Sequence, residues 1–174
     1  MSTQDPSQAQ AVMAAAWHVS QWFNAPESPS LERLHGKVIL LHASQMLCPG
    51  CVSHGVPQAE KVHRRLASDD FAVIGLHTVF EHHDAMRPVS LEAFLHEYKV
   101  IHPVGVDIAM PGTPIPATMQ AYRMRGTPTS ILIDRAGFTR ASADSNVSGL
   151  VPIIARDNSS RLSRNKLDHS TQPE

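Results

Sequence analysis

Residues 37–51 read KVILLHASQMLCPGC, and this stretch decides the fold. Its apolar half predicts a buried strand over Lys37–His42, because the run is made of β-branched residues and leucine. Its second half, Cys48-Pro49-Gly50-Cys51, holds the only two cysteines of the chain. Two thiols spaced in this way at the start of a helix share one helix face. The free N–H groups and positive partial charge of a helix N-terminus favour the reactive thiolate there. The stretch therefore predicts a redox-active dithiol.

Composition narrows the classes of function. The 174 residues fit one domain with a substantial core, and 15 basic against 16 acidic residues leave a formal net charge of −1. This balance, with only 5% aromatic residues, argues against a nucleic-acid partner. No apolar run is long enough to cross a bilayer and no signal peptide is visible, so we expect a cytoplasmic protein without a membrane partner. In a reducing cytosol, closely spaced cysteines are catalytic or metal-binding.

Hydrophobic patterning predicts an alternation of strands and helices. A helix follows Cys51 to about Leu66, bent or split at Pro57. A second helix is expected from an N-cap at Ser90 through Tyr98, and a short third helix ends at about Tyr122. The expected strands are Lys37–His42, Phe71–His77, Val104–Val106, Thr129–Ile133 and Phe138–Ala141. This order predicts an α/β domain with a mixed central sheet and helices on both faces.

The chain is expected to have three parts. Residues 1–16, rich in Ser, Gln and Ala, are predicted to be a flexible lead-in. Residues 17–156 form the folded domain, and the polar segment 157–174 is predicted to be a disordered tail.

Two motifs together resemble the thioredoxin fold, a three-layer sandwich. One is Cys48-Pro49-Gly50-Cys51 after the first core strand, and the other is Gly126-Thr127-Pro128-Thr129 before the fourth. More closely, the chain is similar to the TlpA-type and peroxiredoxin-like (alkyl hydroperoxide reductase/thiol-specific antioxidant) branch. The resemblance spans roughly Trp17 to Arg140. Further matching segments are Leu34-His35-Gly36-Lys37-Val38, Pro103-Val104-Gly105-Val106-Asp107 and Ile131-Leu132-Ile133-Asp134-Arg135-Ala136-Gly137.

The resemblance implies roles around the dithiol. In that family the proline corresponding to Pro128 is cis and faces the disulfide, and a cis X-Pro bond marks a specified tight geometry. The backbone at Thr127 would then lie where an extended substrate peptide can pair with it. Pro49 and Gly50, between the cysteines, would tune the redox poise and, with Thr127, would contact the substrate. No organic cofactor is implied, and electrons would come from an external thiol reductant such as a thioredoxin system.

Three positions depart from the family pattern. Thioredoxins commonly bury an acid six residues before the first cysteine, where this chain has His42. They carry tryptophan just before the motif, where this chain has Leu47. Pro57 lies six residues after Cys51 where the family often has five, which predicts an extra residue or bulge in the helix.

His42 has two interpretations. A histidine near Cys51 accepts a proton readily at neutral pH, so His42 is a candidate base for the second thiol. The alternative is a strand histidine whose ring is satisfied by a backbone carbonyl. The sequence leaves both open.

Three functions fit the motifs. The leading one is a thiol–disulfide oxidoreductase in which Cys48 attacks and Cys51 resolves the mixed disulfide. A peroxidase is the alternative, although the Pro-x-x-x-Thr-x-x-Cys pattern of peroxiredoxins is absent, because a reactive thiol can be oxidised by peroxide. The third is a non-catalytic copper- or zinc-handling protein, suggested by His54 in Cys-x-x-Cys-x-x-His. No fourth ligand is suitably spaced, so no metal is expected.

Two further groups of residues have weaker functional interpretations. Glu81-His82-His83-Asp84 follows the second predicted strand and is expected to be a polar loop at the active-site end of the sheet. Met46, Met86 and Met110 either line an apolar substrate groove or fill the core, and core filling is the simpler expectation.

Overall fold

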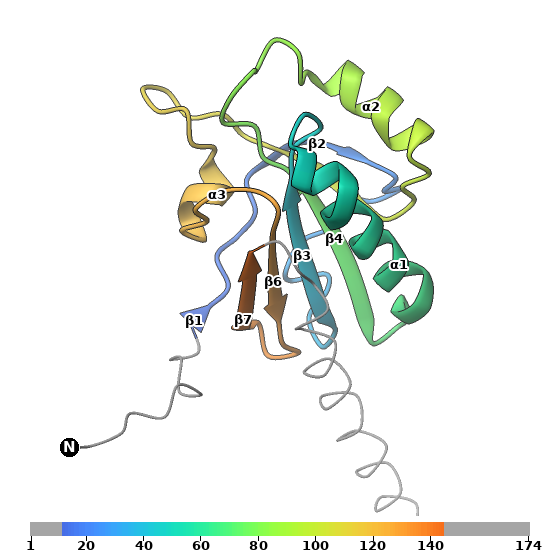
Figure 1. Cartoon of the computed structure of the whole chain (residues 1–174). Coiled ribbons are helices and arrows are strands. Elements are labelled where there is room, and N and C mark those ends of the chain that lie inside the picture. The colour runs from blue at the N-terminus through green and yellow to red at the C-terminus, as the bar shows by residue number, and fades with distance from the viewer. Residues whose placement is uncertain (1–11, 145–174) are drawn as a thin grey trace, which may run out of the picture.

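The computed structural model describes residues 12–144, and a seven-stranded mixed sheet forms their centre (Figure 1). Its strand order is β1-β7-β6-β3-β4-β5-β2. The strands are β1 (Val12–Met13), β2 (Val19–Phe23), β3 (Val38–Ser44), β4 (Phe71–His77), β5 (Val104–Asp107), β6 (Thr129–Ile133) and β7 (Phe138–Asp144). The helical elements are the π-helical turn η1 (Cys51–Gly55), α1 (Val56–Leu66), α2 (Pro88–Glu97) and α3 (Ala117–Ala121).

Strand β3 lies in the middle of the sheet, which explains its continuous apolar sequence. It pairs in parallel with β4 and antiparallel with β6, so both edges are hydrogen-bonded. Helices and loops cover both faces, and six of its seven residues are buried. A strand buried on both faces reads as an unbroken hydrophobic run rather than an alternating one. The chain segment that leads into the dithiol is therefore held at the buried centre of the sheet.

Each face of the sheet has its own core. On one face, Leu40 and Val73 pack against Ala59 of α1. Beside them, Leu91 and Leu95 of α2 pack with Met46 and other buried residues. On the opposite face the buried cluster comprises Ala14, Ile39, Leu41, Ala43, Ile74, Leu76, Ile131 and Ile133, with Trp17, Val19, Trp22, Leu31, Leu34, Tyr122 and Met124 packed against it. These three layers are the thioredoxin-like α/β sandwich that the sequence predicts.

The N-terminal segment corrects the expected domain boundary. The sequence predicts a flexible lead-in over residues 1–16, but Val12 and Met13 pair with β7, and the Ala14 N–H donates to the carbonyl of Gly137 at 2.8 Å. Strand β2 then pairs antiparallel with β5 at the other edge of the sheet. These short edge strands lack a long buried run: both residues of β1 are exposed, and β2 is at most partly buried. Residues 1–11 and the segments 145–156 and 157–174 lie outside the described part of the chain.

Two helix predictions have different outcomes. The N-cap of α2 is Arg87, not Ser90, because Pro88 occupies the first turn, where a missing N–H costs nothing. The extra residue predicted before Pro57 is confirmed. It is absorbed by the π-helical turn η1, after which Pro57 stands in the first turn of α1.

None of the helices within residues 12–144 is long and apolar enough to span a membrane.

Candidate active site

The dithiol lies where β3 ends and η1 begins, at the edge of the sheet formed by the carboxyl ends of β3 and β4. Cys51 opens η1 and is fully buried, whereas Cys48 in the preceding turn is half-exposed. Both cysteines are free. The Cys51 N–H donates to the Cys48 sulfur at 3.3 Å. The backbone N–H at the start of the helical turn therefore points at the first sulfur, as the spacing predicts.

The Thr127-Pro128 bond is cis, as the resemblance implies, and it places this loop against the dithiol. The Cys48 thiol donates to the Thr127 carbonyl at 3.4 Å. A Cβ added to Gly50 would lie 3.4 Å from Pro128 Cδ, which shows how closely the turn and the proline approach. The structure thus brings together Cys48, Gly50, Thr127 and Pro128. Pro49 is exposed at the rim of the turn.

Cys51 has an environment that opposes its ionisation. Burial and, after it, the contact with Cys48 raise the pKa of the Cys51 thiol to about 12. Two hydrogen bonds act in the other direction, one from the backbone N–H of Gln45 and one from the side chain of Thr127. The Gln45 nitrogen lies 3.5 Å from the sulfur. Cys48 is therefore the accessible thiol, and Cys51 needs help to react.

His42 is buried beneath η1. Its Nδ1 lies 2.9 Å from the Ser130 hydroxyl, so the partner is a side chain and not the backbone carbonyl that one interpretation predicted. Its Nε2 has no hydrogen-bond partner. Burial lowers the pKa of His42 to about 3, and the charge of His102 acts in the same direction. His42 is consequently neutral over the physiological range.

The close packing around His42 explains a buried glycine. A Cβ on Gly55 would lie 2.8 Å from Pro128 Cβ and 3.0 Å from His42 Cε1. Real Cβ atoms do not approach so closely, so this position of η1 must be glycine for the turn to rest on both residues.

Gln45 is a site residue that the sequence interpretation missed. It is 2% exposed and hydrogen-bonds three neighbouring segments. Its backbone N–H donates to Cys51, its side-chain Nε2 lies 3.3 Å from Thr127 Oγ1, and its Oε1 accepts from the Phe80 N–H at 3.3 Å. The sequence feature that could have indicated it is a single amide side chain directly after a predicted strand and before the apolar residues Met46 and Leu47.

Solved structures with similar folds decide the family. One, a thioredoxin-like superfamily protein, shares 51% sequence identity over 84% of this chain and 94% of its own, with a TM-score of 0.79. A second, a thiol-disulfide isomerase from Corynebacterium glutamicum, shares 45% identity over the same fractions, with a TM-score of 0.77. The chain belongs to the thioredoxin-like superfamily. No protein-family model and no curated protein sequence matches it.

At lower sequence identity, a structure described as a thiol:disulfide interchange protein from Chlorobium tepidum has a similar fold. It is 18% identical over 86% of this chain and 95% of its own, with a TM-score of 0.64.

The remaining candidate residues of this superfamily member do not gather at the dithiol. His54 is exposed, and its Nδ1 lies 2.7 Å from the Ser53 hydroxyl. Within residues 12–144, no three His, Cys, Asp or Glu side chains are placed to hold a metal ion. The segment Glu81-His82-His83-Asp84 is an exposed loop after β4, as expected.

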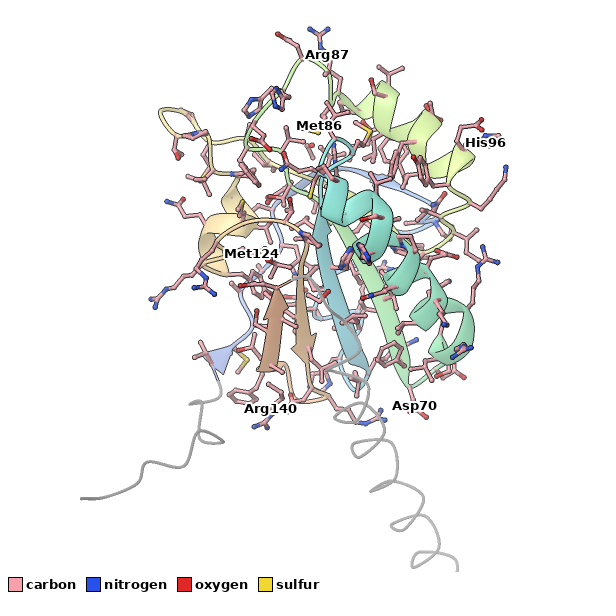
Figure 2. All side chains as sticks on the ribbon, in the orientation of Figure 1. Asp70, Met86, Arg87, His96, Met124 and Arg140 are labelled. Atoms are coloured by element: carbon pink, nitrogen blue, oxygen red, sulfur yellow. The ribbon has the colours of Figure 1, made fainter. Side chains whose placement is uncertain are left out.

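The methionines divide into two groups. Met46 and Met86 are buried in the core under α2, as the simpler expectation had it, whereas Met110 is 38% exposed. In Figure 2, Met86 lies in the interior close to the turn that leads into η1, and Arg87 extends away from the protein. The Met86 carbonyl accepts from His77 Nε2 at 3.2 Å, which ties the loop after β4 to the sheet.

Proposed function

We propose that this protein is a thiol–disulfide oxidoreductase in which Cys48 attacks a substrate disulfide and Cys51 resolves the product. The observation that carries the proposal is the position of Cys48: half-exposed, with the Cys51 N–H on its sulfur and the cis-Pro128 loop beside it. The similarity to a protein described as a thiol-disulfide isomerase supports the same chemistry.

The proposed reaction transfers two electrons from the dithiol to the substrate. The Cys48 thiolate attacks one sulfur of the substrate disulfide, and the other sulfur leaves as a thiolate that takes up a proton. Cys51 then loses its proton and attacks the Cys48 sulfur, which breaks the mixed disulfide and releases the second substrate thiol. The chain ends as a Cys48–Cys51 disulfide, and an external thiol reductant, such as a cytoplasmic thioredoxin system, restores the dithiol.

For His42 we propose the role of transient proton acceptor during resolution. Its Nε2 is unpartnered beneath η1, the element that begins with Cys51. With its pKa lowered to about 3, the ring is unprotonated and Nε2 has a free lone pair. A base this weak does not retain a proton, so any proton that it accepts passes on to solvent. Replacement by alanine is expected to slow resolution and change its pH profile.

For the substrate we propose an extended polypeptide. The backbone at Thr127 and Pro128 borders the half-exposed Cys48, and an extended chain pairs readily with such a backbone edge. Main-chain pairing would hold a substrate cystine over the Cys48 sulfur with little dependence on the neighbouring side chains.

Parallel assays on one preparation test the proposal. We expect the protein to accelerate the reduction of insulin disulfides by dithiothreitol, and the Cys48→Ser variant to lose this acceleration. In the parallel arm, hydrogen peroxide is supplied with a thioredoxin-type reductant. Rapid peroxide consumption with no insulin reduction would replace the proposal with a peroxidase.

A further inference from the structure

A proton that His42 accepts needs a route out of the protein. The His42 ring is 1% exposed, and its Nε2 has no hydrogen-bond partner among the described residues. A Cβ on Gly55 would lie 3.1 Å from that nitrogen, so η1 covers it on this side. A ring in such a place passes a proton on only through a neighbouring group that can take it. The titratable residues that share this buried space therefore determine the route.

A second buried histidine, His102, lines the same small cavity as His42. Gly75 of β4 lies between them: it pairs with His42 of β3 on one side and with Val104 of β5 on the other. A Cβ on Gly75 would lie 3.1 Å from His102 Nε2, so the missing side chain lets this nitrogen lie over β4, beside the strand that carries His42. The cavity has room for about one water molecule, and such a water can bridge two ring nitrogens by hydrogen bonds.

Glu60 of α1 fixes the orientation of the His102 ring. Its Oε2 lies 2.8 Å from His102 Nδ1 and accepts from the Ile101 N–H at 3.1 Å. Burial raises the pKa of Glu60, but the hydrogen bonds from His102 and Ile101 more than offset this, so the pKa is lowered and the side chain is a carboxylate at neutral pH. A carboxylate only accepts hydrogen bonds, so Nδ1 of the neutral ring carries the hydrogen. The lone pair is then on Nε2, the nitrogen beside Gly75.

The neighbours of the two rings favour a proton on His102 over one on His42. His42 Nδ1 contacts the neutral hydroxyl of Ser130, whereas His102 Nδ1 contacts the Glu60 carboxylate. A carboxylate beside an imidazole stabilises the imidazolium. A positive His102 also lowers the pKa of His42, so the two rings do not hold protons together at neutral pH. A proton released from His42 is therefore expected on His102.

Glu60 also connects the pair to the protein surface. Its Oε1 lies 2.9 Å from Nε of Arg64, an exposed residue one turn further along α1. Both side chains line a groove on the surface, from which water can take the proton. The charged and titratable side chains around the pair are His63 and Arg64 of α1, His42 of β3 and His77 of β4, and α2 faces the cavity with Leu91, Phe94 and Leu95.

We propose that His102 and Glu60 form the proton relay of the resolving step. The proton that Cys51 gives to His42 crosses the cavity through a water molecule to His102 Nε2, the Glu60 carboxylate stabilises the resulting imidazolium, and the proton leaves to solvent beside Arg64. Cys51 loses one proton and solvent gains one, so both rings end the cycle neutral. This inference rests on the proposed function. His102 and Glu60 do not touch the substrate, and they act through His42.

The chromogenic disulfide dithiobis-nitrobenzoate separates the two steps. Attack by Cys48 releases the first nitrothiobenzoate at a rate that depends on reagent concentration, and attack by Cys51 on the mixed disulfide releases the second at a rate that does not. Glu60→Gln keeps an acceptor for His102 and Ile101 but removes the charge. We expect it to slow the second release roughly three- to tenfold, because a neutral hydrogen bond replaces a charge-assisted one. The first release should change less than about twofold, since Cys48 attacks without the relay.

The pH profile of the second release distinguishes a relay from a structural role. In the wild type the rate should level off toward higher pH, where His102 is neutral and able to accept. In His102→Gln the rate should instead rise about tenfold per pH unit between about pH 6 and 9, because only hydroxide then removes the proton. In Glu60→Gln the levelling should begin at lower pH, since the imidazolium has lost its carboxylate. Profiles of wild-type shape in both variants would overturn the proposal, and the Glu60→Gln profile decides alone if His102→Gln does not fold.

A double variant tests whether the pair acts through His42. Once His42→Ala has removed the entry to the route, adding Glu60→Gln should slow the second release no further. Multiplying effects of the two changes would overturn the relay.

An exposed pair of the same kind provides the matched control. His96 Nδ1 lies 3.1 Å from Glu97 Oε1 at the end of α2, and both side chains are exposed. Glu97→Gln should therefore keep both release rates and the wild-type pH profile. An equal slowing of the second release in Glu97→Gln and Glu60→Gln would contradict the inference. A wild type that lacks the first release contradicts the proposed function itself, so the two failures are distinct.

Discussion

The two faces of the central sheet differ in the middle of β3. On the face that packs against Tyr122 and Met124, Leu41 lies among buried apolar side chains. On the face under α1, the adjacent residue His42 is buried and hydrogen-bonded to Ser130, beside an apolar cluster that includes Leu40 and Val73. Adjacent strand residues point to opposite faces, so one step along the chain separates the two environments.

Because of this difference, the two faces are expected to contribute differently to folding stability and to thiol exchange. An apolar layer gains free energy from burial, whereas buried polar groups lower stability unless they are hydrogen-bonded. The polar groups under α1 and η1 lie next to the dithiol and the cis-proline loop. We therefore expect changes on the apolar face to affect folding alone, and changes on the polar face to affect thiol exchange as well.

The largest effect on stability is expected from Leu41→Ala on the apolar face. Leu41 is fully buried, and removing its side chain should lower the free energy of unfolding by about 2–5 kcal/mol, which urea denaturation measures. The chromogenic disulfide dithiobis-nitrobenzoate releases one nitrothiobenzoate when Cys48 attacks it and a second when Cys51 attacks the mixed disulfide. Both rates should match those of the wild type under conditions where the variant is folded. A folded Leu41→Ala protein that loses only the second release would contradict the expectation that changes on this face affect folding alone.

Acid should destabilise the folded protein through His42, which is buried on the polar face. Its pKa is lowered from 6.5 to about 3 in the folded state, so the unfolded state binds the proton more readily. Stability is therefore fully present above pH 6.5 and is lost as the pH falls toward 3, by about 1.4 kcal/mol per pH unit. The free energy of unfolding, measured by denaturation at several pH values, should show a smaller decrease toward acid pH in His42→Gln. The variant His35→Gln, at an exposed position, should keep the full decrease. An equal pH dependence of the unfolding free energy in wild type and His42→Gln would contradict the burial of a neutral ring.

Gly55→Ala should disturb both properties moderately. The added Cβ would meet Pro128 Cβ at 2.8 Å and the His42 ring at 3.0 Å, which should cost about 1–3 kcal/mol and displace the cis-proline loop. Thermal unfolding and the second release rate measure the two effects. Gly126→Ala is the control, because a Cβ there meets no atom within 4 Å. Equal behaviour of the two variants would show that η1 does not rest on Pro128.

The smallest effect is expected from His54→Ala. The side chain is exposed and hydrogen-bonds only its neighbour Ser53 among the described residues, so stability should change by less than about 0.5 kcal/mol and both release rates should persist. Zinc titration of the reduced protein provides the counter-test. Tight zinc binding that disappears in His54→Ala would favour the metal-handling alternative.

The sequence predicted the elements whose signal is local and strong. The buried strands β3, β4 and β6 follow continuous apolar runs, and the bounds of β4 and β6 agree with the structure. The extra residue before Pro57 predicted the irregular helix that η1 confirms. Pairing of the N-terminal segment with β5 and β7 was missed, because an edge strand is defined by its partner and has little pattern of its own.

The candidate site was likewise predictable only in part. The cysteines and the cis-proline came from motifs with fixed spacing, and the structure brings them together. The partner of His42 could not be predicted, because Ser130 lies 88 positions away and meets it only through the pairing of β3 with β6. Gln45 was missed for a related reason: its role depends on where Phe80 and Thr127 lie in space.

The assignment of the two cysteines is tested most directly by trapping the mixed disulfide. Reduced Cys51→Ser protein, treated with glutathione disulfide and analysed by intact mass, is predicted to hold one glutathione on Cys48 that persists. The Cys48→Ser protein is predicted to remain unmodified, because the Cys51 sulfur is fully buried. A persistent adduct on Cys51 in Cys48→Ser, with none in Cys51→Ser, would contradict the account.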